Sequence, residues 1–140
     1  MQFEEQILIS APVGKIFALY SNVNGWSSWD PDVKTSAIEG AFVSGANGTL
    51  EPSEGPEVNI TIVSVQKDKS FTMESKLPLC TMTFEHELSP LKSATQVIHR
   101  VSFEGLLAFF FGKVIGNQIH KGLPGTLRGL KRAAESTDVE

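Results

Sequence analysis

The chain has 140 residues, of which 41% are hydrophobic and 20% charged, a composition typical of one globular domain that can bury a sizeable core. Its net charge of −4 and its lack of a lysine or arginine cluster argue against nucleic acid or an anionic membrane surface as its main partner. The single cysteine, Cys80, excludes an internal disulfide, and no apolar run approaches the ~20 residues that a membrane-spanning helix needs.

The segment nearest the N-terminus predicts a strand, a short helix and a turn. Residues 6–11 show the two-residue alternation of a strand with one buried face. Pro12 suits the first position of a helix, where its missing N–H group costs nothing, and the apolar side chains of residues 16–20 form one helical face. A turn then carries Trp26 and Trp29, three residues apart.

The middle of the chain is a series of short β segments separated by turns. Glycine and proline punctuate it, and the segments between them are β-branched or alternate apolar with polar side chains. The predicted strands are residues 33–39, 48–51, 58–66, 71–77, 82–88 and 97–104. Such strands at short spacing imply an antiparallel sheet joined by hairpins.

From Gly105 the apolar period changes from two residues to about 3.6, which predicts a helix over about residues 106–134. Side chains three or four apart form one continuous face that should be buried, namely Phe109, Gly112, Gly116, His120, Leu123, Leu127, Leu130 and Ala134. Pro124, with Gly122 and Gly125 close to it, predicts a kink or break near residue 122. Residues 136–140 form a polar tail that should be frayed.

The order of strand, short helices, about six strands and a long C-terminal helix is a two-layer α+β arrangement. Several marks in this order carry a family resemblance: Ala11–Pro12 leading into a helix, Trp26-x-x-Trp29 with Pro31, Gly105 at the strand-to-helix junction, and Leu130–Lys131. With these marks the chain resembles the START-like (SRPBCC) superfamily over about residues 3–135, most closely its polyketide cyclase/dehydrase-like branch. Gly14 departs from the pattern, because the family often has an acidic residue there.

The resemblance implies the helix-grip fold, a curved antiparallel sheet of about six to seven strands wrapped around a long C-terminal helix, with two short helices after the first strand. It implies a single START-like ligand-binding domain over residues 1–135, followed by the polar tail. Proteins of this superfamily bind hydrophobic small molecules in a cavity between the sheet and the helix, so we expect a ligand of that class as the partner.

The strand alternation, the helix face and the resemblance together predict which residues line this cavity. They are Trp26, Trp29, Ile60, Met73, Phe84, His86, His99, Val101, Phe109, Gly112, Gly116 and His120. For the two tryptophans and the two glycines, a role in packing is an alternative to a role in ligand binding. The tryptophans would pack the short helices against the rest of the fold, and the two glycines would let the helix approach the sheet closely.

The three histidines each lie on a predicted apolar face, and three explanations remain open for them. In the first, each has its own hydrogen-bond partners or is partly exposed. In the second, the three form a polar patch that orients a ligand, and in the third they form a three-histidine metal site. A metal site needs side chains that converge on the ion, and nothing in the sequence imposes such geometry, so we expect no metal and no other cofactor. His86 and His99 should face the interior unless a β-bulge shifts their register.

Motifs for catalysis are missing from the sequence, which has no Ser-His-Asp arrangement, HExxH, CxxC or phosphate-binding loop. The first hypothesis is therefore a binding protein for a lipid, polyketide-like or aromatic molecule. A second is a cyclase, aromatase or dehydratase in which a cavity histidine serves as acid or base. A third is an interaction module whose core is filled by side chains. We find no signal-peptide pattern and expect a cytoplasmic protein that is either a monomer or a homodimer.

Overall fold

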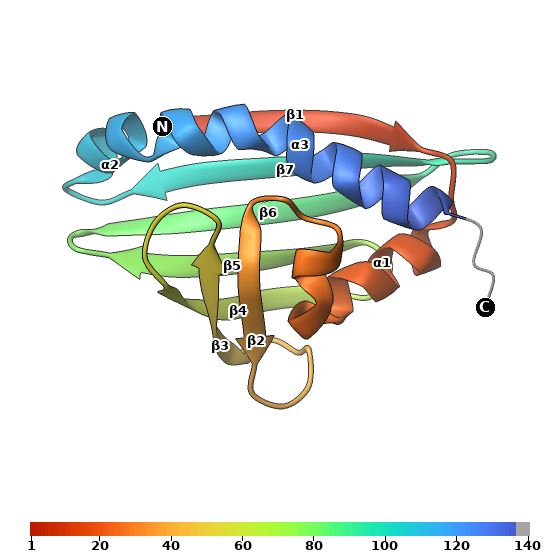
Figure 1. Ribbon diagram of the computed structural model, residues 1–140, viewed down its shortest axis with the longest axis horizontal. Helices are drawn as coiled ribbons and strands as arrows, with labels where there is room; N and C mark the ends of the chain where they lie inside the picture. The colour runs from red at the N-terminus through yellow and green to blue at the C-terminus, as the bar shows by residue number, and fades with distance from the viewer. Residues whose placement is uncertain (137–140) are drawn as a thin grey trace.

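The computed structural model describes residues 1–136, and within them a seven-stranded antiparallel sheet is covered by helices on one face (Figure 1). The strands are β1 (Gln2–Ile9), β2 (Val33–Ile38), β3 (Asn47–Pro52), β4 (Val58–Gln66), β5 (Ser70–Leu77), β6 (Cys80–Pro90) and β7 (Thr95–Glu104). Their spatial order is β1-β7-β6-β5-β4-β3-β2, so β1 and β2 form the two edges. Apart from Ser136, the predicted polar tail lies outside the described residues.

The helical segments are α1 (Val13–Ser21), the 3-10 helix η1 (Val23–Ser28), α2 (Ala108–Val114) and α3 (Gly116–Glu135). Because β1 and β2 lie at opposite edges, the segment that joins them has to cross the sheet, and it does so with α1 and η1 (Figure 1). This crossing brings Tyr20 of α1 against Phe71 and His99, on the face toward α3. We call that face of the sheet the inner face and the opposite one the outer face.

The predicted α+β order of elements is confirmed, with β1, β6 and β7 longer than the sequence pattern indicated. β1 begins at Gln2 because it pairs with β7 along its whole length, from Gln2 opposite Ser102 to Ile9 opposite Thr95. The predicted junction at Gly105 has a physical cause. Gly105 has a φ of +124°, and a Cβ atom there would come within 2.6 Å of the carbonyl oxygen of Leu79, so only glycine fits.

The C-terminal helix breaks at a different place from the one predicted. α2 ends at Val114 and α3 starts at Gly116, whereas Pro124 lies inside α3. A proline removes one backbone hydrogen bond, but the leucines of α3 on both sides of it are packed into the core, and this packing holds the helix together. None of the described helices is both long and apolar enough to cross a membrane.

The break changes which side chains of the helical segment are buried. Leu123, Leu127 and Leu130 of α3 are buried as predicted, with exposed fractions of 6%, 2% and 0%. Phe109 of α2 is 65% exposed, so the prediction that it is buried and lines a cavity is wrong. The prediction extended one helical face through residues 106–134. Gly112 of α2 is buried as predicted, but the break between α2 and α3 leaves Phe109 outside the packed face.

The middle of α3 lies directly against the chain segment between η1 and β2. A Cβ atom added at Gly129 would overlap the carbonyl oxygen of Trp29, and one added at Gly122 would overlap the carboxylate of Asp32. The absence of side chains at these glycines therefore lets the helix backbone approach residues 29–32 closely. This contact holds Trp29 and its neighbours at the edge of the space between the helix and the sheet.

Candidate functional site

A cavity of about 720 Å³ lies between the inner face of the sheet, α3 and the segment that follows η1. Most of its wall is apolar, as in small-molecule sites generally. Eight of the side chains predicted for the cavity lie on this wall, and they are Trp26, Trp29, Ile60, Met73, Phe84, His86, His99 and Val101. For the six of them that lie on strands, the two-residue alternation explains this outcome, because it directs every second side chain toward α3.

One side of the cavity is bordered by exposed residues, which mark its mouth. On the sheet side they belong to the loop of residues 53–56 between β3 and β4, and on the helix side they are Val114, Gln118 and Lys121. The opening therefore lies between this loop and the junction of α2 and α3.

The two glycines predicted to make room for a ligand serve close packing instead. A Cβ atom at Gly116 would come within 2.6 Å of the ring of Phe3, and one at Gly112 would meet the side chain of Met1. Both glycines therefore face the end of β1 and are not on the cavity wall. Of the two explanations that the sequence left open, the structure supports helix–sheet packing.

His120 also lies away from the cavity, contrary to prediction. Its ring stacks on Phe3 at a centroid distance of 5.0 Å, and its Nε2 lies 3.8 Å from a carboxylate oxygen of Glu5. The side chain is 48% exposed, because α3 runs along the edge strand β1 at this point and its outward-facing side chains meet solvent. The three histidines are thus not brought together, and no metal-binding group of His, Cys, Asp or Glu side chains occurs among residues 1–136.

His86 and His99 form a pair at the floor of the cavity. They are directly opposite each other in the register of β6 and β7, and their ring centroids are 4.6 Å apart. Nε2 of His99 shares a hydrogen bond of 2.8 Å with the hydroxyl of Tyr20, a buried side chain that the sequence marked only as part of an apolar helix face. Tyr20, His86 and His99 therefore form a single polar cluster, contributed by α1, β6 and β7.

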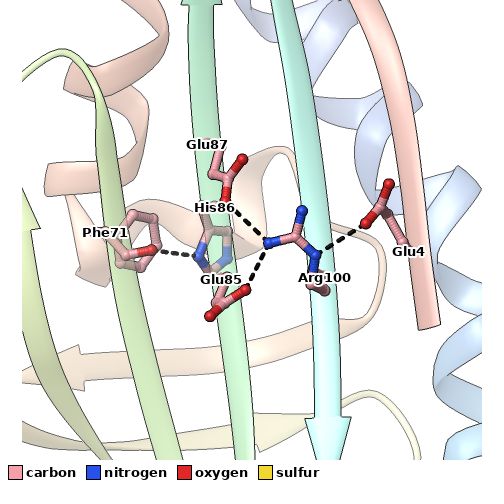
Figure 2. Close-up of polar contacts among 6 residues, drawn as sticks. All are labelled: Glu4, Phe71, Glu85, His86, Glu87 and Arg100. Carbon is pink, nitrogen blue, oxygen red and sulfur yellow. Dashed lines mark hydrogen bonds and ion pairs between the residues drawn. The ribbon is translucent and has the colours of Figure 1, made fainter. Parts of the chain in front are cut away.

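The orientation of the His86 ring is set by Phe71 of β5. The Nδ1–H group of His86 donates a hydrogen bond of 3.2 Å to the carbonyl oxygen of Phe71 (Figure 2). The two rings are also stacked, with centroids 3.9 Å apart and planes within 5°. Since a carbonyl can only accept, Nδ1 carries the proton and Nε2 of the neutral ring is an acceptor. No donor among the described residues hydrogen-bonds that Nε2 atom.

Burial keeps this cluster uncharged. Desolvation lowers the pKa of His86 to about 4, although its hydrogen bond to Phe71 acts in the opposite direction. Desolvation also lowers the pKa of His99 well below its usual range, with the neighbouring His86 adding to the effect, and it raises the pKa of Tyr20. Both imidazoles and the phenol are therefore neutral near pH 7.

The tryptophans differ in their hydrogen bonding. Nε1 of Trp26 donates a bond of 2.9 Å to the carbonyl oxygen of Tyr20. Nε1 of Trp29 is buried, and none of residues 1–136 accepts a hydrogen bond from it. A buried donor without a partner costs about 1–3 kcal/mol, so Nε1 of Trp29 lowers the stability of the fold locally.

Asp30 adds an acidic group to the wall beside Trp29. One of its carboxylate oxygens accepts hydrogen bonds of 2.9 Å from the hydroxyl of Thr126 on α3 and from the backbone N–H of Asp32. Burial raises the pKa of Asp30 to about 6, these hydrogen bonds oppose the rise, and the nearby charge of Asp32 adds to it. Sequence reasoning missed this residue, because its contact with Thr126 joins segments that are far apart in the sequence.

The charged groups on the same strands face the opposite way. Arg100 of β7 contacts Glu4, Glu85 and Glu87 at 2.9, 2.6 and 2.9 Å on the outer face (Figure 2). The hydrogen bonds to Glu85, Glu87 and Glu4 raise the pKa of Arg100. This network joins β1, β7 and β6 on the outer face of the sheet.

Comparison with known proteins gives a family and a fold. The family model described as polyketide cyclase / dehydrase and lipid transport matches residues 1–135. Similar solved structures include protein MLL2253 from Mesorhizobium loti (TM-score 0.78, 14% identity, covering 99% of this chain and 100% of that chain). Truncated norcoclaurine synthase from Thalictrum flavum has a TM-score of 0.74 at 12% identity, with 99% and 95% covered. Ara h 8.0201 has a TM-score of 0.76 at 13% identity, with 98% and 99% covered. No curated protein sequence matches the chain.

Proposed function

Because the chain belongs to the polyketide cyclase / dehydrase and lipid transport family, we propose that it binds an apolar small molecule in the cavity beneath α3. The observation that carries this proposal is the cavity itself, with its volume of about 720 Å³ and its mostly apolar wall. An interior filled by side chains, the third possibility raised by the sequence, would leave no such space. The family and its START-like helix-grip fold host ligand-binding and cyclase-like proteins, and the ligand of this chain is the open question.

The polar groups on the wall suggest what the ligand carries. Nε2 of His86 offers an acceptor on the cavity wall, and no donor among the described residues bonds it. The ring of Tyr20 lies beside it, with a centroid distance of 5.4 Å. We therefore expect a mainly apolar or aromatic molecule with a hydroxyl group that donates to His86.

The cavity is tested by two matched substitutions on β5. Met73 is 5% exposed and lies on the cavity wall, whereas the next side chain, Thr72, points to the outer face. Met73→Trp should fill part of the cavity and reduce the fluorescence gain of the apolar dye Nile red, and Thr72→Trp should leave it unchanged. Circular dichroism verifies that both variants fold. Equal dye binding by folded Met73→Trp and the unaltered protein would remove the ligand site from this cavity.

The hydroxyl preference is tested with the matched pair of naphthol and naphthalene, followed by quenching of tryptophan fluorescence. His86→Phe keeps an aromatic ring stacked on Phe71 but removes the acceptor. One hydrogen bond is worth about 0.5–1.5 kcal/mol, so the preference for naphthol should fall about two- to tenfold in this variant. A preference that stays the same would contradict the role of His86.

Acid–base catalysis at His86 is the second candidate, supported by the unpartnered Nε2 atom in the cavity. A general base works best when its pKa lies near the working pH, and the pKa of His86, about 4, makes it a weak base at pH 7. We therefore rank binding above catalysis. A reaction that converts a polyketide-like substrate and is lost in His86→Phe with binding intact would reverse this ranking.

A further inference from the structure

A group of large apolar side chains is exposed at the end of the molecule where α2 lies. The exposed fractions are 86% for Leu106, 65% for Phe109, 55% for Phe110, 60% for Val114 and 63% for Leu79. Leu79 belongs to the same surface because its carbonyl oxygen accepts a hydrogen bond of 2.9 Å from the N–H of Leu107. We call these five residues the α2 face. Apolar side chains gathered in this way mark an interaction surface more often than scattered ones do.

The helical segment that carries most of the α2 face has only positive charges, and the exposed Glu104 directly precedes it. From Gly105 to Ala134 the chain contains no aspartate or glutamate, and its cations there are Lys113, Lys121, Arg128, Lys131 and Arg132. The chain as a whole has a net charge of −4, so the acidic groups are concentrated elsewhere. Nζ of Lys113 lies 4.8 Å above the ring of Phe109, which places a cation directly beside the apolar group.

The α2 face also borders the mouth of the cavity. Val114 belongs to both the α2 face and the rim of the mouth. The exposed Lys121 of α3 lies on the same rim. Whatever covers the α2 face would therefore also cover the route by which a ligand enters or leaves.

From this combination we propose that the α2 face docks on the surface of an anionic lipid bilayer. Leu106, Phe109 and Phe110 enter the boundary between headgroups and acyl chains, and Lys113 and Lys121 contact the lipid phosphates. Apolar side chains flanked by lysine are the pattern of interfacial helices, which lie on a membrane without spanning it. The mouth of the cavity then faces the bilayer, so that an apolar ligand need not cross water.

Charge favours a lipid surface over a second copy of the chain. A symmetric dimer through the α2 face would gather the cations of both helical segments at one interface. No acid of residues 105–134 is available to compensate them. Net charge and the lack of a lysine or arginine cluster argued against an anionic membrane surface as the main partner, and the proposal rests instead on the exposed α2 face with cations of the helical segment beside it.

Co-sedimentation with lipid vesicles tests the proposal without any knowledge of the ligand. The protein should bind vesicles of equal parts phosphatidylcholine and phosphatidylglycerol, and should bind weakly to phosphatidylcholine alone or at high salt. Phe109→Ser/Phe110→Ser should reduce binding at least about tenfold, since both rings leave the interface. Lys113→Glu/Lys121→Glu should reduce it by a similar factor, because one lysine near an anionic surface contributes about fivefold, or about 1 kcal/mol.

The matched control is Val63→Ser/Leu91→Ser, which removes two apolar side chains that are 39% and 55% exposed and lie away from α2. Leu91 follows the end of β6 opposite to Leu79, so this variant should bind vesicles as the unaltered protein does. Absence of binding to anionic vesicles, or binding equal in the phenylalanine variant and the unaltered protein, would overturn the proposal. So would a dimer in size-exclusion chromatography that Phe109→Ser/Phe110→Ser dissociates, because a second copy would then cover the face. None of these outcomes bears on Nile red binding, so the proposed function is tested separately.

Discussion

At the residue scale, His99 and Arg100 show how a strand separates two chemistries that are adjacent in sequence. His99 is 4% exposed and points to the inner face, where burial keeps its imidazole neutral beside Tyr20. Arg100 points to the outer face, where glutamates raise its pKa and keep it charged. The same backbone thus carries a neutral polar cluster toward the cavity and a charged network toward water, and Figure 2 shows the charged network.

His86 and His99 should not become protonated in a pH titration over the neutral range. We expect the imidazole signals of His86 and His99, followed by NMR, to stay unchanged from about pH 8 down to about pH 5, because desolvation disfavours both imidazolium forms. Titration midpoints near the ordinary value of about 6.5 would mean that these rings are hydrated and that the cavity floor is open to water.

Because the pKa of Asp30 is raised in the folded protein, Asp30 should make the protein less stable as the pH rises from about 4 to about 6. The pKa of Asp30 in the folded protein is about 6, above its value in the unfolded chain. Its contribution to the free energy of unfolding is therefore fully present below about pH 4 and is lost as the pH rises through about 6. Asp30→Asn keeps an acceptor for Thr126 but cannot ionise. The variant should therefore gain stability relative to the unaltered protein, by at most about 3 kcal/mol, between about pH 4 and pH 7.

Urea unfolding of both proteins across this range measures the effect. The lowered pKa values of His86 and His99 change stability in the opposite direction, but they are shared by both proteins and cancel in the difference. A difference that is constant with pH would show that Asp30 is hydrated in the folded protein.

At the scale of elements, the position of α3 depends on two glycines that have no side chain to keep the helix away from its neighbours. Gly122 and Gly129 bring its backbone against Asp32 and Trp29, and Thr126, on the same side of the helix, bonds Asp30. Leu123, Leu127 and Leu130 meanwhile fill the core beneath it. One helix therefore closes the cavity, buries Asp30 and holds Trp29 in the wall.

Two glycines of α3 provide a matched test of this close contact. Gly129→Ala should destabilise the protein by about 1–3 kcal/mol, because the new methyl group would overlap the carbonyl oxygen of Trp29. Gly125→Ala should be neutral or stabilising by up to about 1 kcal/mol, since the nearest atom to its Cβ, on Pro31, is 3.7 Å away and alanine favours a helix. Equal stability of the two variants in urea unfolding would mean that α3 and residues 29–32 are not in contact.

At the scale of the whole molecule, the cavity is a cost to stability that a ligand can offset. An interior space of about 720 Å³ forgoes packing contacts that a filled core would make. A ligand that binds only the folded protein adds stability in proportion to the logarithm of its concentration, about 2.7 kcal/mol at a hundred times its dissociation constant.

Ligand binding should therefore raise the unfolding temperature of the whole domain. For a chain of this size, that stabilisation corresponds to a rise of several degrees in Tm, measurable by differential scanning calorimetry with naphthol as the probe. Met73→Trp, whose cavity is partly filled, should show a smaller rise than Thr72→Trp. An equal rise in the two variants would place the bound probe somewhere other than the cavity.

The periodicity of the sequence by itself determined the sheet, the switch to helix and the inner face. Alternation along a strand is a local property, so Met73, Phe84, His86 and His99 could be assigned to one side before any contact was known. The family resemblance also followed from short local marks such as Ala11–Pro12 and Gly105.

Only the tertiary structure decided how the helical segment faces the sheet. The break at residue 115 exposes Phe109, and the path of α3 along β1 turns His120 outward, because the facing of a helix depends on the elements it packs against. Burial depends on the same packing. The pKa values of Asp30 and His86, and the missing partner of Trp29, exist because distant segments meet around the cavity, and no local pattern in the sequence records which segments those are.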